Sequence, residues 1–345
     1  EIRKYFEPKH PENLINRFST EPSNSSIQVE LKDETGTTIL KEISLNEIST
    51  KVDDVIRELT LGSDFINHHT LSRIYAYYHK EEINLFDIFE YELLAFITFK
   101  NPLVKEGEET GSENAESWWE YIKAAIPTFE KKEIIEKYLK EFNDNFKSYL
   151  NDITESTNKY ITDTFKEDFN IKFEYRLATY PLPPENETPV EKGKEVQPPA
   201  IVMTVVMLTD KIAEAEKKEI DSPQSFLNEA KLSTIALALR LAILDEKYVE
   251  AFPKVLILDD MLMSMDLSNR EFVLDIILDN YQADYQIVFL THQRGLFEDA
   301  KNAIQQHYAE QVKVAGVSEI EKQNSAWLEH WHAYEMYVGE DKNGI

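Results

Sequence analysis

The sequence has no cysteine and no long apolar run. Without cysteine, disulfides and thiolate metal sites are excluded, and with them disulfide-stapled secreted scaffolds and zinc ribbons. No apolar stretch approaches the roughly 20 residues that a membrane-spanning helix needs. No positively charged and then apolar leader opens the sequence. We therefore expect a soluble, cytoplasmic protein without a membrane partner.

Positive charge is also scarce. The 345 residues include 37 Lys and Arg against 64 Asp and Glu, which gives a formal net charge of −27. Such a surface as a whole repels the phosphates of nucleic acids and of anionic lipids. Lysines such as Lys211, Lys217 and Lys218 lie among glutamates, so no basic stripe stands out. Any contact with DNA would therefore use a local basic patch, and DNA stays open as a partner.

Apolar residues make up 42% of the chain and aromatic residues 11%, which is enough to form a buried core. Wholesale disorder is therefore excluded, and the length suits two or three packed sub-domains. An acidic, polar stretch at residues 104–117 indicates a linker. We expect three parts: residues 1–103, residues 104–169 and residues 170–345.

The N-terminal half combines strands with long helices. Residues 26–31 alternate between apolar and polar side chains, which predicts a half-buried strand with a hairpin partner at residues 38–40. Residues 50–100 are predicted to be mostly helical. Residues 118–166 predict two helices with a break at Pro127. An apolar stripe along the second of these helices favours a short arm packed on a neighbour, with a dedicated binding groove as the alternative; it contains Ile135, Tyr138, Leu139, Phe142, Phe146, Tyr149, Leu150 and Ile153.

The C-terminal half alternates strands and helices. Strands are predicted at residues 171–182 and 200–209, and a mainly apolar helix at residues 225–247. Two short strands are then predicted at residues 254–260 and 286–292, each followed by a helix, at residues 269–282 and 295–312. This alternation of strands and helices is typical of a parallel sheet. The fold class is therefore expected to be α/β, with ligands at the carboxyl ends of the parallel strands.

Two acidic residues, Asp259 and Asp260, close the apolar run at residues 254–260. One carboxylate at a strand end can hold Mg²⁺, and the next can orient a water molecule for attack on a phosphate. Asp266 adds a third acid, and His292 closes the following strand. Each signal alone has an ordinary structural explanation, because many buried strands end in acids and a lone histidine is often a capping residue. Their order along the chain favours a nucleotide site.

These residues resemble the ABC-type ATPase heads of the SMC, RecN and RecF kind. Residues 226–240 resemble the signature segment and its helix, and residues 254–260 resemble the Walker B strand. In this resemblance Asp259 takes the magnesium position, Asp260 the position of the catalytic glutamate and His292 that of the switch histidine. The D-loop position falls on Ser264 and Asp266. The position of the Leu-Ser-Gly-Gly-Gln/Glu signature falls on Leu227, Asn228, Glu229, Ala230 and Lys231.

The resemblance implies an ABC-ATPase head with a mixed or parallel sheet flanked by helices and a short helical arm inserted between two lobes. ATP and Mg²⁺ are the implied cofactors. The implied activity is ATP hydrolysis in a head-to-head homodimer or higher homo-oligomer that acts on DNA or on an effector protein subunit. The short arm is similar to those of bacterial anti-phage defence and DNA-repair ATPases rather than to chromosome-scale rings.

The sequence departs from this family at four positions and in one further segment. Asn228 replaces the usual serine, and Glu229 with Ala230 replaces the glycine pair that lets backbone N–H groups approach a phosphate. Asp260 is one methylene shorter than glutamate, which predicts slow turnover. In the segment where such heads carry a glutamine loop, Asn67, His68 or His69 stands in its place, with an ordinary polar loop as the alternative.

A phosphate-binding loop of the form Gly-x-x-x-x-Gly-Lys-Ser/Thr is missing, because the nine glycines are scattered. The favoured interpretation is that the sequence begins downstream of that loop, because residues 1–6 resemble the end of a helix; a degenerate head is the alternative. Two other functions compete with the ATPase. One is a non-hydrolysing scaffold that restrains an effector protein, and the other is a nuclease or other hydrolase that uses Asp259, Asp260 and Asp266.

Overall fold

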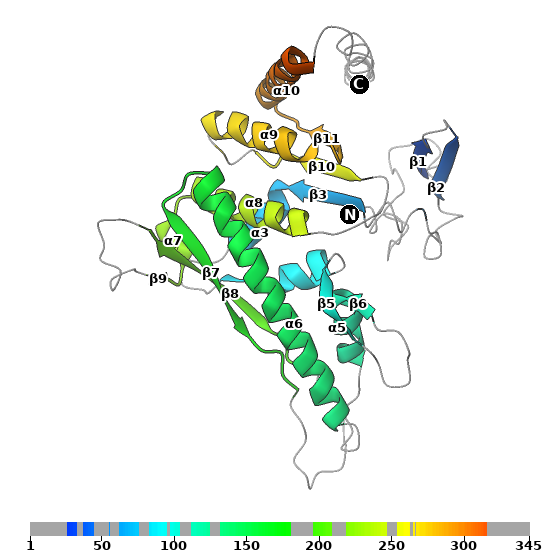
Figure 1. Ribbon diagram of the computed structural model, residues 1–345, viewed down its shortest axis with the longest axis vertical. Coiled ribbons are helices and arrows are strands. Elements are labelled where there is room, and N and C mark those ends of the chain that lie inside the picture. The colour runs from blue at the N-terminus through cyan, green and yellow to red at the C-terminus, as the bar shows by residue number, and fades with distance from the viewer. Residues whose placement is uncertain are drawn as a thin grey trace, which may run out of the picture. The chain divides into compact units, whose positions relative to one another are not determined.

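Figure 1 shows the computed structural model of the chain. Contacts divide it into two compact units: Glu1–Met265 with Tyr285–Leu290, and Asp266–Asp284 with Thr291–Ile345. The three-part division predicted from the sequence stays a prediction. The structure describes residues 26–32, 37–44, 55, 62–75, 83–94, 97–103, 112–124, 132–180, 196–208, 219–246, 254–262, 265 and 267–315.

An antiparallel hairpin opens the described part of the first unit. It consists of β1 (Ser26–Lys32) and β2 (Thr38–Ser44), and its register runs from Ser26 opposite Ser44 to Lys32 opposite Thr38. The alternating pattern of residues 26–31 predicted the first strand, and residues 38–40 predicted its partner. Both predictions are confirmed.

A parallel three-stranded sheet lies in the same unit and has the order β11-β10-β3. Its strands are β3 (Ser63–Asn67), β10 (Val255–Asp259) and β11 (Gln286–Leu290). The parallel pairing of β10 with β11 confirms the α/β fold class that the C-terminal pattern predicted. The helical prediction for residues 50–100 is wrong at Ser63–Asn67, because pairing with β10 holds this segment extended.

A second, antiparallel sheet is built on β7 (Phe169–Arg176) and β8 (Ala200–Met207), which pair along their whole lengths. The short strands β4 (Ile83–Asn84) and β9 (Glu219–Ile220) also pair with β8. Residues 201–205 are buried without a break, so β8 runs through the core. The strand predicted at residues 171–182 is confirmed as far as Arg176, and the one predicted at residues 200–209 is confirmed as far as Met207. The two sheets together form the expected mixed α/β architecture.

The long helix α6 (Lys132–Lys159) packs on β7, β5 and α5, as Figure 1 shows. Here β5 is Thr98–Leu103 and α5 is Ala115–Ala124. The predicted apolar stripe of α6 is buried, apart from the half-buried Tyr149, so it packs within this unit as the sequence favoured. Its rings join an aromatic core of edge-to-face and stacked contacts that includes Phe86, Phe89, Phe99, Trp118, Trp119, Phe142 and Phe146.

Smaller elements surround this core. The linker predicted at residues 104–117 is wrong at its end, where β6 (Ser112–Asn114) pairs with β5 and α5 begins. The N-terminal side supplies α3 (His68–Tyr75), which directly follows β3, and α4 (Phe86–Ile88), which continues into a π-helical turn at Phe89–Leu93.

Helix α8 (Glu229–Glu246) follows the short helix α7 (Pro223–Phe226). Every residue from Leu232 to Leu244 is buried, which fits a helix that is apolar on all faces and lies inside a protein. It packs against α6 and α3. Neither α8 nor any other helix in the described part of the chain is long and apolar enough to span a membrane.

The second unit contains α9 (Leu267–Tyr281) and α10 (Arg294–Ala315), which pack on each other. Both helices were predicted at nearly these bounds. Their buried residues include Val273, Ile277, Leu296, Ala300 and Ala303.

Candidate functional site

The carboxyl ends of the three parallel strands define the candidate site. Asn67 ends β3, Asp259 ends β10 and Leu290 ends β11, and these residues are paired across the sheet. Asn67 and Asp259 are half-buried. Ligands of open α/β sheets bind beyond the carboxyl ends of the strands. The register therefore brings an amide residue and a carboxylate residue together at the edge where a ligand would bind.

Asp260, the next residue, has a left-handed backbone conformation with φ of 49°. Its N–H donates a 3.0 Å hydrogen bond to the carbonyl oxygen of Leu290. Asp and Asn adopt this conformation more readily than other non-glycine residues, because their short polar side chains can bond locally. The turn ends β10 directly after Asp259, and the hydrogen bond ties it to the end of β11.

Apolar side chains anchor the chain beyond this turn. Met261 and Leu262 are fully buried, and Met265 is nearly so. The N–H of Met265 donates to the carbonyl oxygen of Leu262 at 3.1 Å. These contacts hold the segment that leaves the sheet edge. Ser264 and Asp266, the predicted D-loop residues, lie outside the described residues.

His292 follows β11 by two residues and belongs to the second unit. Its side chain is exposed. The N–H of Gln293 donates to the hydroxyl oxygen of Thr291 at 3.2 Å, and the N–H of Phe297 donates to the carbonyl oxygen of Gln293 at 3.0 Å. These bonds make a compact turn into α10. A role for His292 with Asp260 stays a prediction from the sequence.

The predicted signature segment forms the start of α8. Leu227 is buried and its N–H donates to the carbonyl oxygen of Pro223, which closes α7. Asn228 is exposed and caps α8, because its Oδ1 accepts the N–H of Lys231 at 2.9 Å. Glu229 is exposed and Ala230 is half-buried. The segment is therefore an asparagine-capped helix N-terminus, a place where backbone N–H groups favour anions.

Lys231 is engaged within its own chain. Its Nζ lies 2.7 Å from Oε2 of Glu167 and 3.6 Å from Oδ1 of Asp168. Partial burial lowers the pKa of Lys231, but the hydrogen bond and charge of Glu167, with those of Asp168, outweigh it and raise the pKa above its ordinary value. The predicted contact of Lys231 with a nucleotide stays a prediction.

A buried ion pair that the sequence analysis missed joins α8 to β3. Nη2 of Arg240 lies 2.6 Å from Oδ1 of Asp64 and also donates to the carbonyl oxygen of Phe65 at 3.2 Å. Only 4% of the Arg240 side chain and 8% of the Asp64 side chain are exposed. The sequence signal was a single charged residue inside an apolar helix, since a buried charge needs a partner. Helix α8 is thus fastened to a strand of the candidate site.

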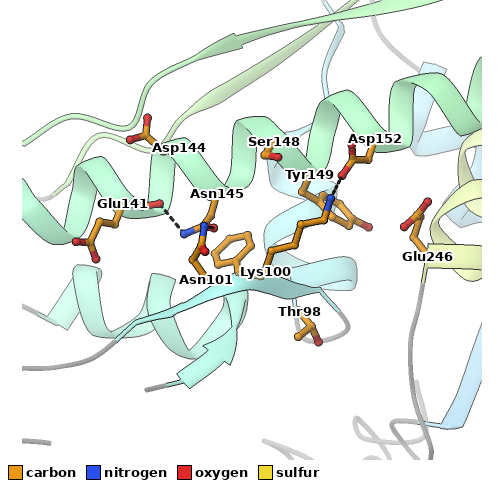
Figure 2. Close-up of a pocket in the computed structure, with 11 residues that line it drawn as sticks. Thr98, Lys100, Asn101, Glu141, Asp144, Asn145, Ser148, Tyr149, Asp152 and Glu246 are labelled. Atoms are coloured by element: carbon orange, nitrogen blue, oxygen red, sulfur yellow. Dashed lines mark hydrogen bonds and ion pairs between the residues drawn. The ribbon is translucent and has the colours of Figure 1, made fainter. Parts of the chain in front are cut away.

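A separate hollow of about 480 Å³ lies between β5 and α6 (Figure 2). Lys100 on β5 bonds to Asp152 on α6 at 2.7 Å, and this hydrogen bond and charge raise the pKa of Lys100. The hollow shares no residue with the candidate site. The described lining contains four carboxylates, those of Glu141, Asp144, Asp152 and Glu246. Because they outnumber the cations there, the hollow repels phosphates.

The residues at the sheet edge suit Mg²⁺. The described residues contain no cluster of three or more His, Cys, Asp or Glu that would hold a metal by itself. Mg²⁺ bound with a nucleotide does not need such a cluster, because one or two carboxylates complete a shell made of water and phosphate oxygens. Asp259, with the amide oxygen of Asn67, offers this kind of donor set.

No protein-family model matches the sequence, and no curated protein does. Several solved structures are similar at low identity. One is the Smc head domain of Pyrococcus furiosus with an extended coiled coil, bound to the C-terminal domain of ScpA. The similarity covers 49% of this chain and 35% of that one, with 15% identity and a TM-score of 0.30. The chain therefore spans about a third of that structure.

The recombination mediator protein RecF of the RecFOR pathway is also similar. Its RecF–ATP structure has 13% identity and a TM-score of 0.37, over 78% of this chain and 71% of that one. Its RecF–ATPrS structure has 13% identity and a TM-score of 0.35, over 79% and 72%. At these values, the chemistry of the site must carry any functional argument.

Proposed function

We propose that the chain is part of an ABC-type ATPase head of the SMC and RecF kind, which binds ATP with Mg²⁺ and hydrolyses it between two heads. The observation that carries this proposal is the register of Asn67, Asp259 and Leu290 at one sheet edge, with the left-handed turn at Asp260 tied to β11. An acidic strand end beside a second polar strand end suits the binding of a nucleotide with its magnesium ion.

The proposed roles follow from the donor groups. Asp259 and Asn67 hold Mg²⁺, which when bound neutralises charge on the phosphate oxygens. The carboxylate of Asp260 accepts a proton from the attacking water, and His292 donates a hydrogen bond to the terminal phosphate. The start of α8, with Asn228, faces the nucleotide of a second copy. Asp260 places its carboxylate one methylene closer to the backbone than a glutamate would, so turnover is expected to be slow.

The proposed output is control of a partner, either DNA or an effector protein subunit, in anti-phage defence or DNA repair. The net charge of −27 favours an effector protein, because DNA would be repelled by most of the surface. A homodimer, or a higher homo-oligomer, is the proposed working assembly.

The test is ATP turnover by the full-length natural polypeptide, with and without double-stranded DNA. Asp260→Asn keeps the shape of the side chain but removes its basicity, and we expect turnover to fall at least about a hundredfold. The same variant should retain ATP and form a dimer by light scattering. Glu136→Gln, an equal change of charge at an exposed position of α6, is the matched control and should leave turnover unchanged.

A non-hydrolysing scaffold is the second candidate. The altered signature supports it, because Asn228 and Glu229 stand where small residues would let a phosphate approach. ATP binding and dimerisation without turnover in the wild type would support the scaffold and overturn the hydrolase. Turnover that persists in Asp260→Asn would overturn the proposed site.

A further inference from the structure

The turn that joins α6 to β7 has a defined backbone. After α6 the chain forms a π-helical turn at Tyr160–Thr164, and Lys166 then adopts a left-handed conformation with φ of 56°. The N–H of Glu167 donates to the carbonyl oxygen of Ile161 at 3.0 Å. The carbonyl oxygen of Asp168 accepts the N–H of Leu208 at 2.8 Å, which fixes the turn to the end of β8. Two adjacent carboxylates are thereby held in place.

Lys231 meets this turn from the first turn of α8. Its Nζ contacts both carboxylates and lies 5.3 Å from the ring centre of the buried Phe169. The Glu167 side chain is only 21% exposed and that of Lys231 is 35% exposed. Partial shelter from water makes such a pair stronger than a fully exposed one.

Lys231 also takes part in the helix cap. Its backbone N–H bonds to Oδ1 of Asn228, while its side chain bonds to Glu167. One residue therefore links the cap of α8 to the turn between α6 and β7. Moving the ammonium group to a phosphate would break two charge contacts and leave two adjacent carboxylates without their cation.

We propose that Lys231 is a positioning residue, whose ion pair with Glu167 holds the capped start of α8 in place, and that it is not itself a phosphate ligand. This inference rests on the proposed function, in which Asn228 lies beside the nucleotide of a second copy.

The test compares Lys231→Met, Glu167→Gln and the charge exchange Lys231→Glu/Glu167→Lys in the full-length natural polypeptide. Each single variant should lower kcat about tenfold and change KM for ATP less than about twofold, because binding is retained and alignment is lost. The exchange should restore kcat to within about threefold of the wild type. The control is Lys172→Met, which breaks the exposed pair of Lys172 with Glu219 and should have no effect.

The opposite pattern would overturn the inference. If Lys231 binds phosphate, Lys231→Met raises KM strongly, Glu167→Gln has no effect and the exchange does not restore activity. Unchanged kinetics in both single variants would overturn it as well.

Amide hydrogen exchange in the first turn of α8 separates this inference from the proposed function, because it needs no ATP. Both single variants should speed exchange there, and the charge exchange should slow it again. If the wild type does not hydrolyse ATP, the proposed function is wrong, and so is the predicted effect of the Lys231–Glu167 pair on kcat. If amide hydrogen exchange is unchanged in the single variants, the Lys231–Glu167 pair does not hold the start of α8 in place.

Discussion

At the scale of single residues, backbone conformation explains the acid at position 260. The left-handed turn there is the point at which β10 leaves the sheet, and its N–H is bonded to Leu290. Aspartate tolerates this conformation better than most other non-glycine residues. An aspartate is therefore suited to this backbone, whatever the chemical role of its carboxylate.

Substitutions at Asp260 should sort by their tolerance of the left-handed conformation. Asp260→Val should lower the free energy of unfolding by about 1–2 kcal/mol, since a β-branched residue is strained there. Asp260→Asn and Asp260→Gly should remain within about 0.5 kcal/mol of the wild type. Urea denaturation measures these differences. A valine variant as stable as the glycine variant would contradict the argument.

At the scale of elements, α8 connects the parts of the first unit. Lys231 fastens its start to the turn between α6 and β7, and Arg240 fastens its middle to Asp64 on β3. Its remaining buried surface is almost wholly apolar. Nε of Arg240 is buried and has no hydrogen-bond partner, so the pair is not fully satisfied. Such a pair specifies where α8 sits more than it adds net stability.

Breaking this pair from one side should be costly. Arg240→Met should lower the free energy of unfolding by about 3–5 kcal/mol, because it leaves Asp64 buried without its cation. The double variant Arg240→Met/Asp64→Leu should lose clearly less than the single variant, since no buried charge remains. Urea denaturation of both variants tests this, with the exposed Lys172→Met as the control. A double variant less stable than Arg240→Met would contradict the expectation.

At the scale of the whole molecule, raised pKa values of buried and paired groups predict a loss of stability at alkaline pH. Burial raises the pKa of Tyr175 far above the ordinary value of 10.0, and its hydroxyl donates to Oδ1 of Asn143 at 2.7 Å. Burial, with the charge of Glu246, also raises the pKa of Tyr149. The pKa of Lys231 is raised as well, by carboxylates that outweigh its partial burial. The folded chain therefore holds these protons more tightly than the unfolded chain.

Stability should be lost as the pH rises through this range. A raised pKa stabilises the folded state fully below the unfolded-state pKa, here about 10, and this contribution disappears as the pH rises towards the folded-state value. Lysines also lose their positive charge at high pH, so the net charge becomes more negative than −27. The added repulsion lowers the stability of the folded state as well. Thermal melts between about pH 8 and pH 11 should show Tm falling above about pH 10.

Tyr175→Phe provides the control for this prediction. The variant has no ionisable hydroxyl at this position, so its Tm should fall less steeply above about pH 10 than that of the wild type. It should also be less stable at neutral pH, because Asn143 loses a hydrogen bond. Equal slopes in the two proteins would show that Tyr175 does not contribute to the alkaline loss.

The sequence by itself determined what depends on local periodicity. The alternation at residues 26–31, the apolar stripe of α6 and the strand–helix order after residue 254 all predicted elements that the structure contains, because each pattern is complete within one segment. The position of Asp259 at a strand end followed from the same reasoning. The chemical roles of Asp259, Asp260 and His292 stay predictions.

Tertiary structure decided what depends on distant partners. Ser63–Asn67 is a strand because β10 pairs with it, although residues 50–100 were predicted to be mostly helical. Arg240 and Asp64 are separated by 176 positions, so no local pattern could join them. The left-handed turn at Asp260 and the ion pair between Lys231 and Glu167 likewise depend on neighbours that only folding brings together. Hydrogen bonds and charges act over a few ångströms in space, whatever the separation of their residues along the chain.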